Sequence, residues 1–166
     1  MFTLTERITI AAAATDTFAT IDLGSYVDVG DRQALQVHSV DFIFQGATAA
    51  EPIYTTLPAA SQVSVQVTDL NRSGLVFSND RALVASGILN FDQDAYLSHA
   101  TDLYPDNYGK GSDDGRFVVN DALYITGNAS ALGTSVNVTV RVNASIVTLS
   151  NKDFMAIAIQ STAADN

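Results

Sequence analysis

The feature that most constrains the fold is an alternation of valine with polar residues near the C-terminal end of the chain. In the segment SVNVTVRVNAS, one side of an extended chain carries Val136, Val138, Val140 and Val142, and the other side carries polar residues. Successive side chains of a β-strand point to opposite faces of its sheet, so a period of two indicates an antiparallel strand with one face buried. On the polar face, Asn137 and Asn143 are expected to form cross-strand ladders.

Shorter segments repeat this pattern along the chain. The segment SQVSVQVTD places Val63, Val65 and Val67 on one face, and Ser64, Gln66 and Thr68 on the other. Further strand-like runs occupy residues 6–10, 18–23, 40–44, 74–78, 81–91 and 116–127. Clusters of Gly, Asn, Asp and Ser separate the runs, as turns require. We therefore expect one all-β domain over residues 1–166, an antiparallel, jelly-roll-like β-sandwich of about eight to ten strands.

The C-terminal segment after residue 149 leaves two alternatives open. Ser150 and Asp153 resemble a capping box with Asp in place of Glu, which favours a short terminal helix. The helix would gather three apolar side chains on one face, those of Phe154, Ile157 and Ala158. A final strand would instead align Met155, Ile157 and Ile159. We favour the helix.

The charge balance excludes some classes of partner. The formal net charge is −10, and Glu6 and Glu51 are the only glutamates among the 18 acidic residues. Such a chain lacks the basic footprint that nucleic-acid binding needs, and anionic lipid headgroups do not attract it. The excess of Asp over Glu and of Arg over Lys suits a saline habitat, although Asp is also the acid that turns prefer.

The lack of cysteine and of recognisable targeting segments also restricts the possible functions of the chain. The chain contains no cysteine, so disulfides, thiol nucleophiles and thiolate metal sites are excluded. No stretch approaches the roughly 20 apolar residues of a membrane-spanning helix. Residues 1–18 do not resemble a secretory signal because Glu6 and Arg7 interrupt them. We expect a protein that is made in the cytosol and used without processing.

The segment DLYPDNYGKGSDDGR, residues 102–116, is the best candidate for a metal site. Calcium prefers closely spaced carboxylate oxygens. The candidate ligands are Asp102, Asp106, Asp113 and Asp114. The spacing matches no EF-hand, however, and Lys110 and Arg116 would place positive charge inside the cage.

The alternative for residues 102–116 is a solvated or intersubunit loop, and this is the interpretation that we prefer. Its candidate interface residues are Tyr104 and Tyr108, because a tyrosine offers apolar area together with a polar tip. A bound calcium ion or another structural cation remains the alternative for this loop, and we expect no other cofactor.

Catalytic chemistry has few candidates. Asp92 and Asp94 would point to one side of an extended chain, but their polar surroundings do not make either a general acid. His38 and His99 are the only histidines, and no G-x-S-x-G nucleophile motif accompanies them. We therefore expect no enzyme activity and no catalytic residues.

The pattern of strands, the loop lengths and the final segment DALYITGNASALGTSVNVTVRVNASIVTLS, interpreted as a hairpin, resemble a known family. These are the single jelly-roll capsid proteins of icosahedral, membrane-containing viruses of halophilic archaea. The likeness is architectural and includes no diagnostic motif. It implies a virion structural protein, made in the host cytoplasm, that self-assembles or co-assembles with other virion proteins into an icosahedral shell above an internal membrane.

Other functions would use the same sandwich. Within the virion, the chain would alternatively be a head-decoration or tail protein. Outside it, a carbohydrate-binding or adhesion module is an alternative. Such modules usually present aromatic platforms, and this chain has no tryptophan.

Overall fold

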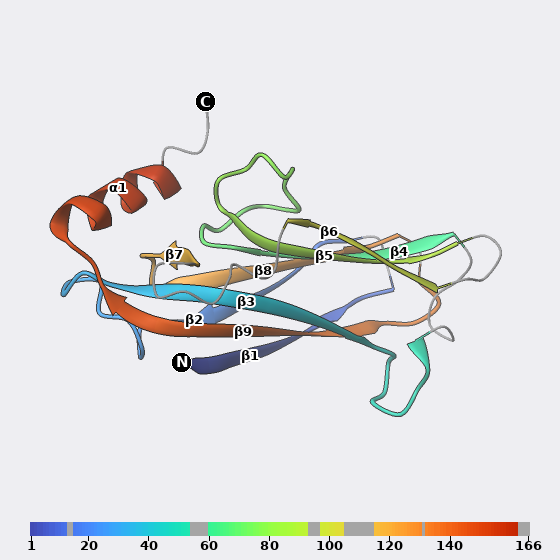
Figure 1. The fold of residues 1–166 in the computed structure, drawn as a ribbon. Helices are drawn as coiled ribbons and strands as arrows, with labels where there is room; N and C mark the ends of the chain where they lie inside the picture. The colour runs from blue at the N-terminus through green and yellow to red at the C-terminus, as the bar shows by residue number, and fades with distance from the viewer. Residues whose placement is uncertain (13–14, 54–59, 93–96, 105–114, 131, 163–166) are drawn as a thin grey trace.

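A computed structural model describes residues 1–12, 15–53, 60–92, 97–104, 115–130 and 132–162, with the backbone alone at 97–104 and 160–162. Its strands form two antiparallel sheets that lie one above the other (Figure 1). The first sheet has the order β1-β9-β3-β7, with β1 at Phe2–Ile10, β9 at Val136–Thr148, β3 at Gln33–Gln45 and β7 at Arg116–Val118. The second has the order β2-β8-β4-β5-β6, with β2 at Thr17–Asp22, β8 at Ala122–Ala129, β4 at Ser61–Thr68, β5 at Leu83–Phe91 and β6 at Leu97–Tyr104.

The chain crosses repeatedly between the two sheets. Strands β1, β3, β7 and β9 belong to the first sheet, and β2, β4, β5, β6 and β8 belong to the second. Without β6, which adds a strand at one edge, this is the eight-stranded order of a jelly roll, in which two Greek keys fold over each other. The predicted all-β sandwich of the jelly-roll type is confirmed.

The expected hairpin between residues 121 and 150 is wrong in one respect. β8 pairs with β2 and β4 in the second sheet, whereas β9 lies between β1 and β3 in the first. The connection after β8 therefore carries the chain across the sandwich. This route lets the apolar face of β8 pack against the valine face of β9 through the core, which a two-stranded hairpin within one sheet would not allow.

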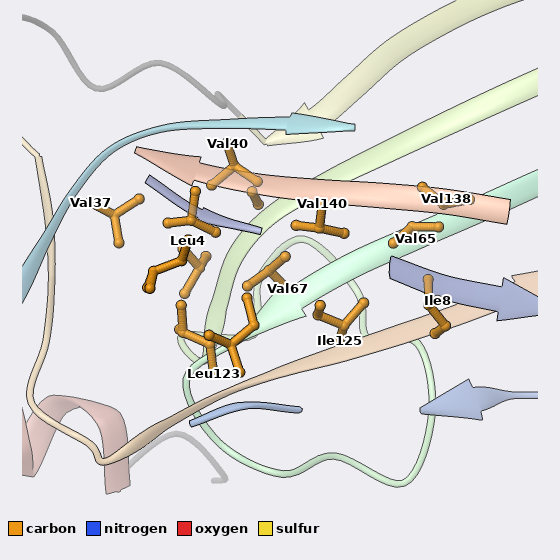
Figure 2. Close-up of a cluster of buried hydrophobic side chains, with 14 of the residues drawn as sticks. Leu4, Ile8, Val37, Val40, Val65, Val67, Leu123, Ile125, Val138 and Val140 are labelled. Carbon is orange, nitrogen blue, oxygen red and sulfur yellow. The ribbon is translucent and has the colours of Figure 1, made fainter. Parts of the chain in front are cut away.

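The core lies between the inner faces of the sheets (Figure 2). All four alternating valines of β9 are fully buried, as predicted. Two glycines allow the sheets to approach, because they carry no side chain where a residue of the other sheet reaches across. A Cβ at Gly87 would lie 2.8 Å from Cδ2 of Phe42, and one at Gly127 would lie 2.7 Å from Cδ1 of Ile10.

On the outer face of the first sheet, asparagine side chains join three strands. Thr3 of β1 donates a hydrogen bond to Oδ1 of Asn143 (2.9 Å), and Nδ2 of Asn143 donates to Oγ of Ser39 on β3 (2.9 Å). At the other end of β9, Thr9 donates to Asn137 (2.7 Å), and Asn137 donates to the carbonyl oxygen of residue 46 (2.9 Å). These are the cross-strand ladders expected from the sequence.

The outer face of the second sheet differs from the expectation. Residues 69–82, which connect β4 to β5, rise over this sheet as an irregular loop, so the strand expected at 74–78 is wrong. The loop covers Ser64, Gln66 and Thr68, which are buried although the sequence places them on a polar face. A strand with alternating apolar and polar residues can thus be buried on both faces when a loop covers its polar face.

Two other segments also depart from the expected boundaries. Residues 116–127 form two strands, β7 and β8, because the chain changes sheets between them. β6 extends to Tyr104, so Asp102 lies in an edge strand and not in the loop that the sequence predicts.

The helix expected at the C-terminus is confirmed as α1 (Asn151–Thr162), at one end of the sandwich. Ser150 caps it: its Oγ accepts a hydrogen bond from the backbone N–H of Asp153 (3.2 Å) and donates to Oδ2 of the same residue (2.6 Å). Phe154, Ile157 and Ala158 are half-buried, as the helical pattern requires.

Candidate functional site

Most of the predicted calcium and interface residues fall outside the part of the chain that the structure describes. These are Asp106, Tyr108, Asp113 and Asp114. Asp102 and Tyr104 belong to β6, where only the backbone is described, and Tyr104 lies opposite Ser86 of β5 in the strand register. The calcium site and the tyrosine interface therefore stay predictions.

The structure also describes no site that contains both Asp92 and Asp94. Asp94 lies outside the described residues, and the carbonyl oxygen of Asp92 accepts a hydrogen bond from the N–H of Ala60 at 3.3 Å. His99 belongs to β6, so its side chain is not described.

His38 does contact a serine, but with the wrong polarity for catalysis. Its Nε2 lies 2.8 Å from Oγ of Ser145, and the same Oγ lies 3.2 Å from Oε1 of Gln36. An amide oxygen only accepts hydrogen bonds, so the Ser145 hydroxyl donates to Gln36 and accepts from Nε2–H of His38. The Nδ1 atom of His38 is buried and has no hydrogen-bond partner among the described residues. A serine nucleophile needs the opposite arrangement, in which the imidazole accepts the hydroxyl proton.

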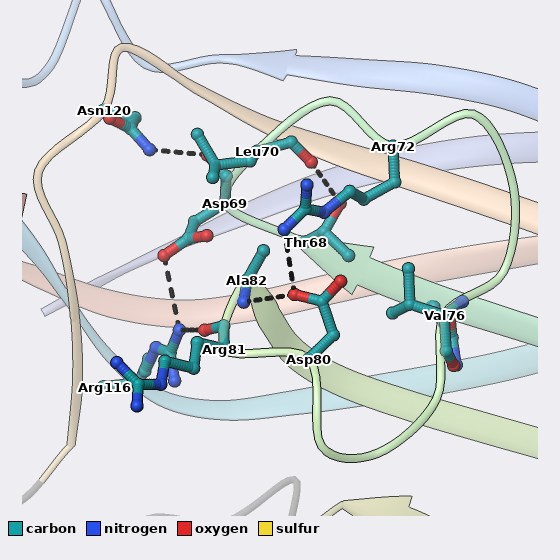
Figure 3. Close-up of polar contacts among 11 residues, drawn as sticks. Thr68, Asp69, Leu70, Arg72, Val76, Asp80, Arg81, Ala82, Arg116 and Asn120 are labelled. Atoms are coloured by element: carbon teal, nitrogen blue, oxygen red, sulfur yellow. Dashed lines mark hydrogen bonds and ion pairs between the residues drawn. The ribbon is translucent and has the colours of Figure 1, made fainter. Parts of the chain in front are cut away.

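The loop over the second sheet is fastened by two ion pairs (Figure 3). Arg72 and Asp80 join the two halves of the loop at 3.1 Å, and Asp80 also accepts the backbone N–H of Ala82 (2.8 Å). Arg116, at the start of β7, pairs with Asp69 at 3.3 Å and donates to the carbonyl oxygen of Arg81. The loop is therefore tied to both sheets.

Asp69 is a buried carboxylate in this network. Burial raises the pKa of Asp69 above its ordinary value, and the Arg116 guanidinium offsets only part of the rise. The Oδ1 atom of Asp69 is buried with no hydrogen-bond partner in the described part of the chain. The backbone of Asp69 does have a partner, because the side-chain amide of Asn120 donates a hydrogen bond to the Asp69 carbonyl oxygen at 2.6 Å. These contacts indicate a structural role in fixing the loop.

Beside the loop lies a groove on the outer face of β4 and β5, with a cavity of about 240 Å³. It is lined by Ser64, Val65, Gln66, Leu75, Val76, Phe77, Ser86, Gly87 and Ile88. We call it the β4–β5 groove. None of these residues carries a charge, and Phe77 is 88% exposed.

Helix α1 carries a second exposed apolar surface. Met155 and Ile159, four residues apart on one side of the helix, are 57% and 58% exposed. Between the helix and its own sandwich, a cavity of about 390 Å³ is lined by Phe117, Leu149, Asp153, Ala156 and Ile157.

The groove was missed by the sequence interpretation, although a signal for it exists. The apolar triplet Leu75, Val76 and Phe77 lies between clusters of turn residues, which predicts a short strand. The same composition suits a loop that packs on a sheet through a few apolar side chains. The polar residues of β4 give the second signal, since a buried glutamine such as Gln66 needs a backbone partner.

Within the described residues, no group of three His, Cys, Asp or Glu side chains is placed to hold a metal ion. The one helix in that part of the chain is too short to cross a membrane. Neither the models of known protein families nor the curated protein sequences include a match to this chain.

Proposed function

We propose that this chain is a virion structural protein, a capsid subunit that assembles with its own copies or with other virion proteins into an icosahedral shell. The observation that carries the proposal is the jelly-roll strand order, β1-β9-β3-β7 facing β2-β8-β4-β5-β6. Jelly rolls are the architecture of many viral capsid domains, but also of lectins and cupins. The fold therefore supports the proposal without being sufficient for it.

The surface of the protein favours a subunit of an assembly over the other functions of jelly-roll proteins, those of lectins and cupins. Large apolar side chains are exposed at several places, among them Phe77 beside the β4–β5 groove and Met155 with Ile159 on α1. Aromatic residues and methionine are the types enriched in protein interfaces, where burial removes them from water. The polarity of the His38–Ser145 contact also argues for structure over catalysis.

The acidity of the subunit sets the conditions for assembly. Copies with a net charge of −10 repel each other, and salt shortens the range of that repulsion to about 3 Å at 1 M ionic strength. Assembly is then the salt-sensitive step, whereas the sandwich itself is held by its apolar core. The proposed location is the virion, after synthesis in the host cytoplasm, with the shell close to an internal membrane.

The test is sedimentation of the purified protein over a salt series, with and without calcium, followed by electron microscopy of any fast species. We expect rings, capsomers or shells whose yield rises with salt. Equal particle yields in dilute and molar salt would contradict the electrostatic argument. A monomer at every condition would argue against a shell subunit and favour a decoration protein or a carbohydrate-binding module.

A further inference from the structure

A groove that is separate from the β4–β5 groove lies between β2, β8 and the first part of the loop of residues 69–82. Its cavity of about 590 Å³ falls within the roughly 300–1,000 Å³ of sites that bind small molecules. We call it the β2–β8 groove. The residues that line it include Phe18, Thr20, Asn71, Arg72, Ser73 and Tyr124.

The two strands contribute aromatic side chains to this groove. Ile21 and Leu123 point into the core, so Phe18, Thr20 and Tyr124, which have the opposite parity, belong to the outer face of the sheet. Thr20 lies opposite Tyr124 in the strand register, and Phe18 is the next outward residue along β2. Phe18 is 54% exposed and Tyr124 is half-buried. The groove therefore offers aromatic surface to a ligand.

The polar groups of the groove come from β2 and from the loop. Thr20, Asn71 and Ser73 are all exposed. None of these three side chains forms a hydrogen bond with another residue that the structure describes. Two hydroxyl groups and one amide, which together donate and accept hydrogen bonds, are thus available to a ligand beside the aromatic surface.

The loop that forms one wall is held in place. Arg72 is paired with Asp80 at 3.1 Å (Figure 3). At Gly74 the backbone packs directly on the residue before β2, because a Cβ there would lie only 2.8 Å from Oδ2 of Asp16. Asp16 in turn accepts a hydrogen bond from Nδ2 of Asn128 on β8. A wall that is fixed in advance reduces the entropy that a ligand loses on binding.

Charge and polarity restrict the class of ligand. Arg72 is the one charged residue in the lining, and Asp80 already balances it. The net charge of −10 repels anions such as nucleotides. A lipid chain would cover the hydroxyl and amide groups without pairing them, which costs free energy. An extended peptide adds to the edge of a sheet through its backbone, whereas this groove lies on a face.

A neutral sugar has the matching chemistry. Its ring carries C–H groups on its faces, which pack on aromatic rings, and hydroxyl groups around its rim, which both donate and accept hydrogen bonds. We propose that the β2–β8 groove binds a neutral carbohydrate, with a sugar ring against Phe18 and its hydroxyl groups bonded to Thr20, Asn71 and Ser73. Phe18 and Tyr124 supply the aromatic platform that the lack of tryptophan argued against.

This binding site goes beyond the proposed shell function and does not rest on it. The groove belongs to a single copy of the chain, so it binds its ligand whether or not the copies assemble. In a shell subunit, such a site would attach the particle to glycans.

The first test maps binding on isotope-labelled protein by nuclear magnetic resonance. The probes are neutral oligosaccharides of glucose, galactose, mannose and N-acetylglucosamine, with a sulfated oligosaccharide for comparison. Each is added up to about 10 mM, which detects a Kd on the order of 1 mM. We expect at least one neutral probe to shift the backbone amide signals of Phe18, Asn71 and Tyr124 until they saturate. No saturable shift with any neutral probe, or a response to the sulfated probe alone, would overturn the inference.

The second test compares two substitutions of exposed phenylalanines. Phe18→Ala removes the ring from the β2–β8 groove, and we expect the Kd of the bound oligosaccharide to rise about tenfold. The matched control is Phe77→Ala, outside this groove, which should leave the Kd unchanged. Asn71→Ala, which changes an exposed loop residue, should also raise the Kd. An unchanged Kd in both Phe18→Ala and Asn71→Ala, or an equal rise in Phe77→Ala, would show that the sugar binds elsewhere.

Discussion

The side-chain amide of Gln66 forms two hydrogen bonds with the backbone of Val76, as a neighbouring strand would. Nε2 of Gln66 donates to the Val76 carbonyl oxygen at 2.8 Å, and the Val76 N–H donates to Oε1 of Gln66 at 2.7 Å. One side chain of β4 thus holds the middle of the loop that borders the β4–β5 groove. Because Gln66 is buried, water does not compete for these bonds.

Replacement of Gln66 should release the loop. In Gln66→Leu, the Val76 N–H and carbonyl groups lose both partners, and at about 1 kcal/mol for each hydrogen bond we expect a loss of about 2 kcal/mol in the free energy of unfolding. The measurement is urea unfolding together with hydrogen exchange at the Val76 amide. Gln62→Leu, at an exposed position of the same strand, is the control. If both variants are equally stable, the two bonds do not hold the loop.

Gly87 should not tolerate a side chain while Phe42 is present. A Cβ at Gly87 would lie 2.8 Å from Cδ2 and 2.9 Å from Cγ of Phe42, so the ring must shift within a packed core. We expect Gly87→Ala to destabilise the protein by about 1–3 kcal/mol, the usual cost of overpacking. In a double-mutant cycle, Phe42→Leu should reduce this cost. Purely additive effects would mean that the two residues do not compete for the same space.

Removal of the helix cap should affect α1 and leave the sandwich intact. Ser150→Ala eliminates the bonds to Asp153 and should cost the helix about 1 kcal/mol. Because α1 lies at one end of the sandwich and belongs to neither sheet, we expect faster hydrogen exchange in the helix with an unchanged midpoint of thermal unfolding. A large drop in that midpoint would show that the helix stabilises the domain as a whole.

The burial of Asp69 should make stability depend on pH. Its pKa in the folded protein is raised above the ordinary 3.8, so the folded state binds the proton more tightly than the unfolded chain does. The stabilising contribution of this proton is complete below pH 3.8 and is lost as the pH rises through the folded pKa. In Asp69→Asn this titration is absent. The free energy of unfolding of the unmodified protein should therefore rise relative to that of Asp69→Asn as the pH falls from neutral towards the unfolded pKa. Urea unfolding at several pH values measures the difference, and a constant difference would contradict the shift.

The sequence allows the faces of the strands to be predicted better than their partners. Val136, Val138 and Val140 are buried as expected, because a period of two depends only on the local backbone. The sheet to which a strand belongs depends on distant contacts, so the expected hairpin of β8 and β9 was wrong. Ser150 and Asp153 identified the helix correctly, because a cap is formed by residues three apart.

The candidate site was harder to predict for a related reason. The β4–β5 groove arises where Leu75 and Phe77 pass over Ser86, and no local pattern relates these residues. The hydrogen bonds between Gln66 and Val76 span ten residues and take the place of the strand that the apolar triplet predicts. A groove between a loop and a sheet forms through tertiary packing. The periodicity of one segment of the sequence therefore cannot predict it.

The pairing of β1 with β9 determines when this fold can form. Phe2 lies opposite Ala144, and Ile10 opposite Val136, so the first strand finds its partner in a segment more than a hundred residues later in the chain. A polypeptide emerging from the ribosome at about 5–20 residues per second exposes β1 for several seconds before that partner exists. Truncated chains that stop before β9 should therefore leave an unpaired apolar strand open to chaperones and proteases. Only a chain synthesised through β9 can complete its first sheet, which would keep unfinished chains out of any assembly that needs the finished sandwich.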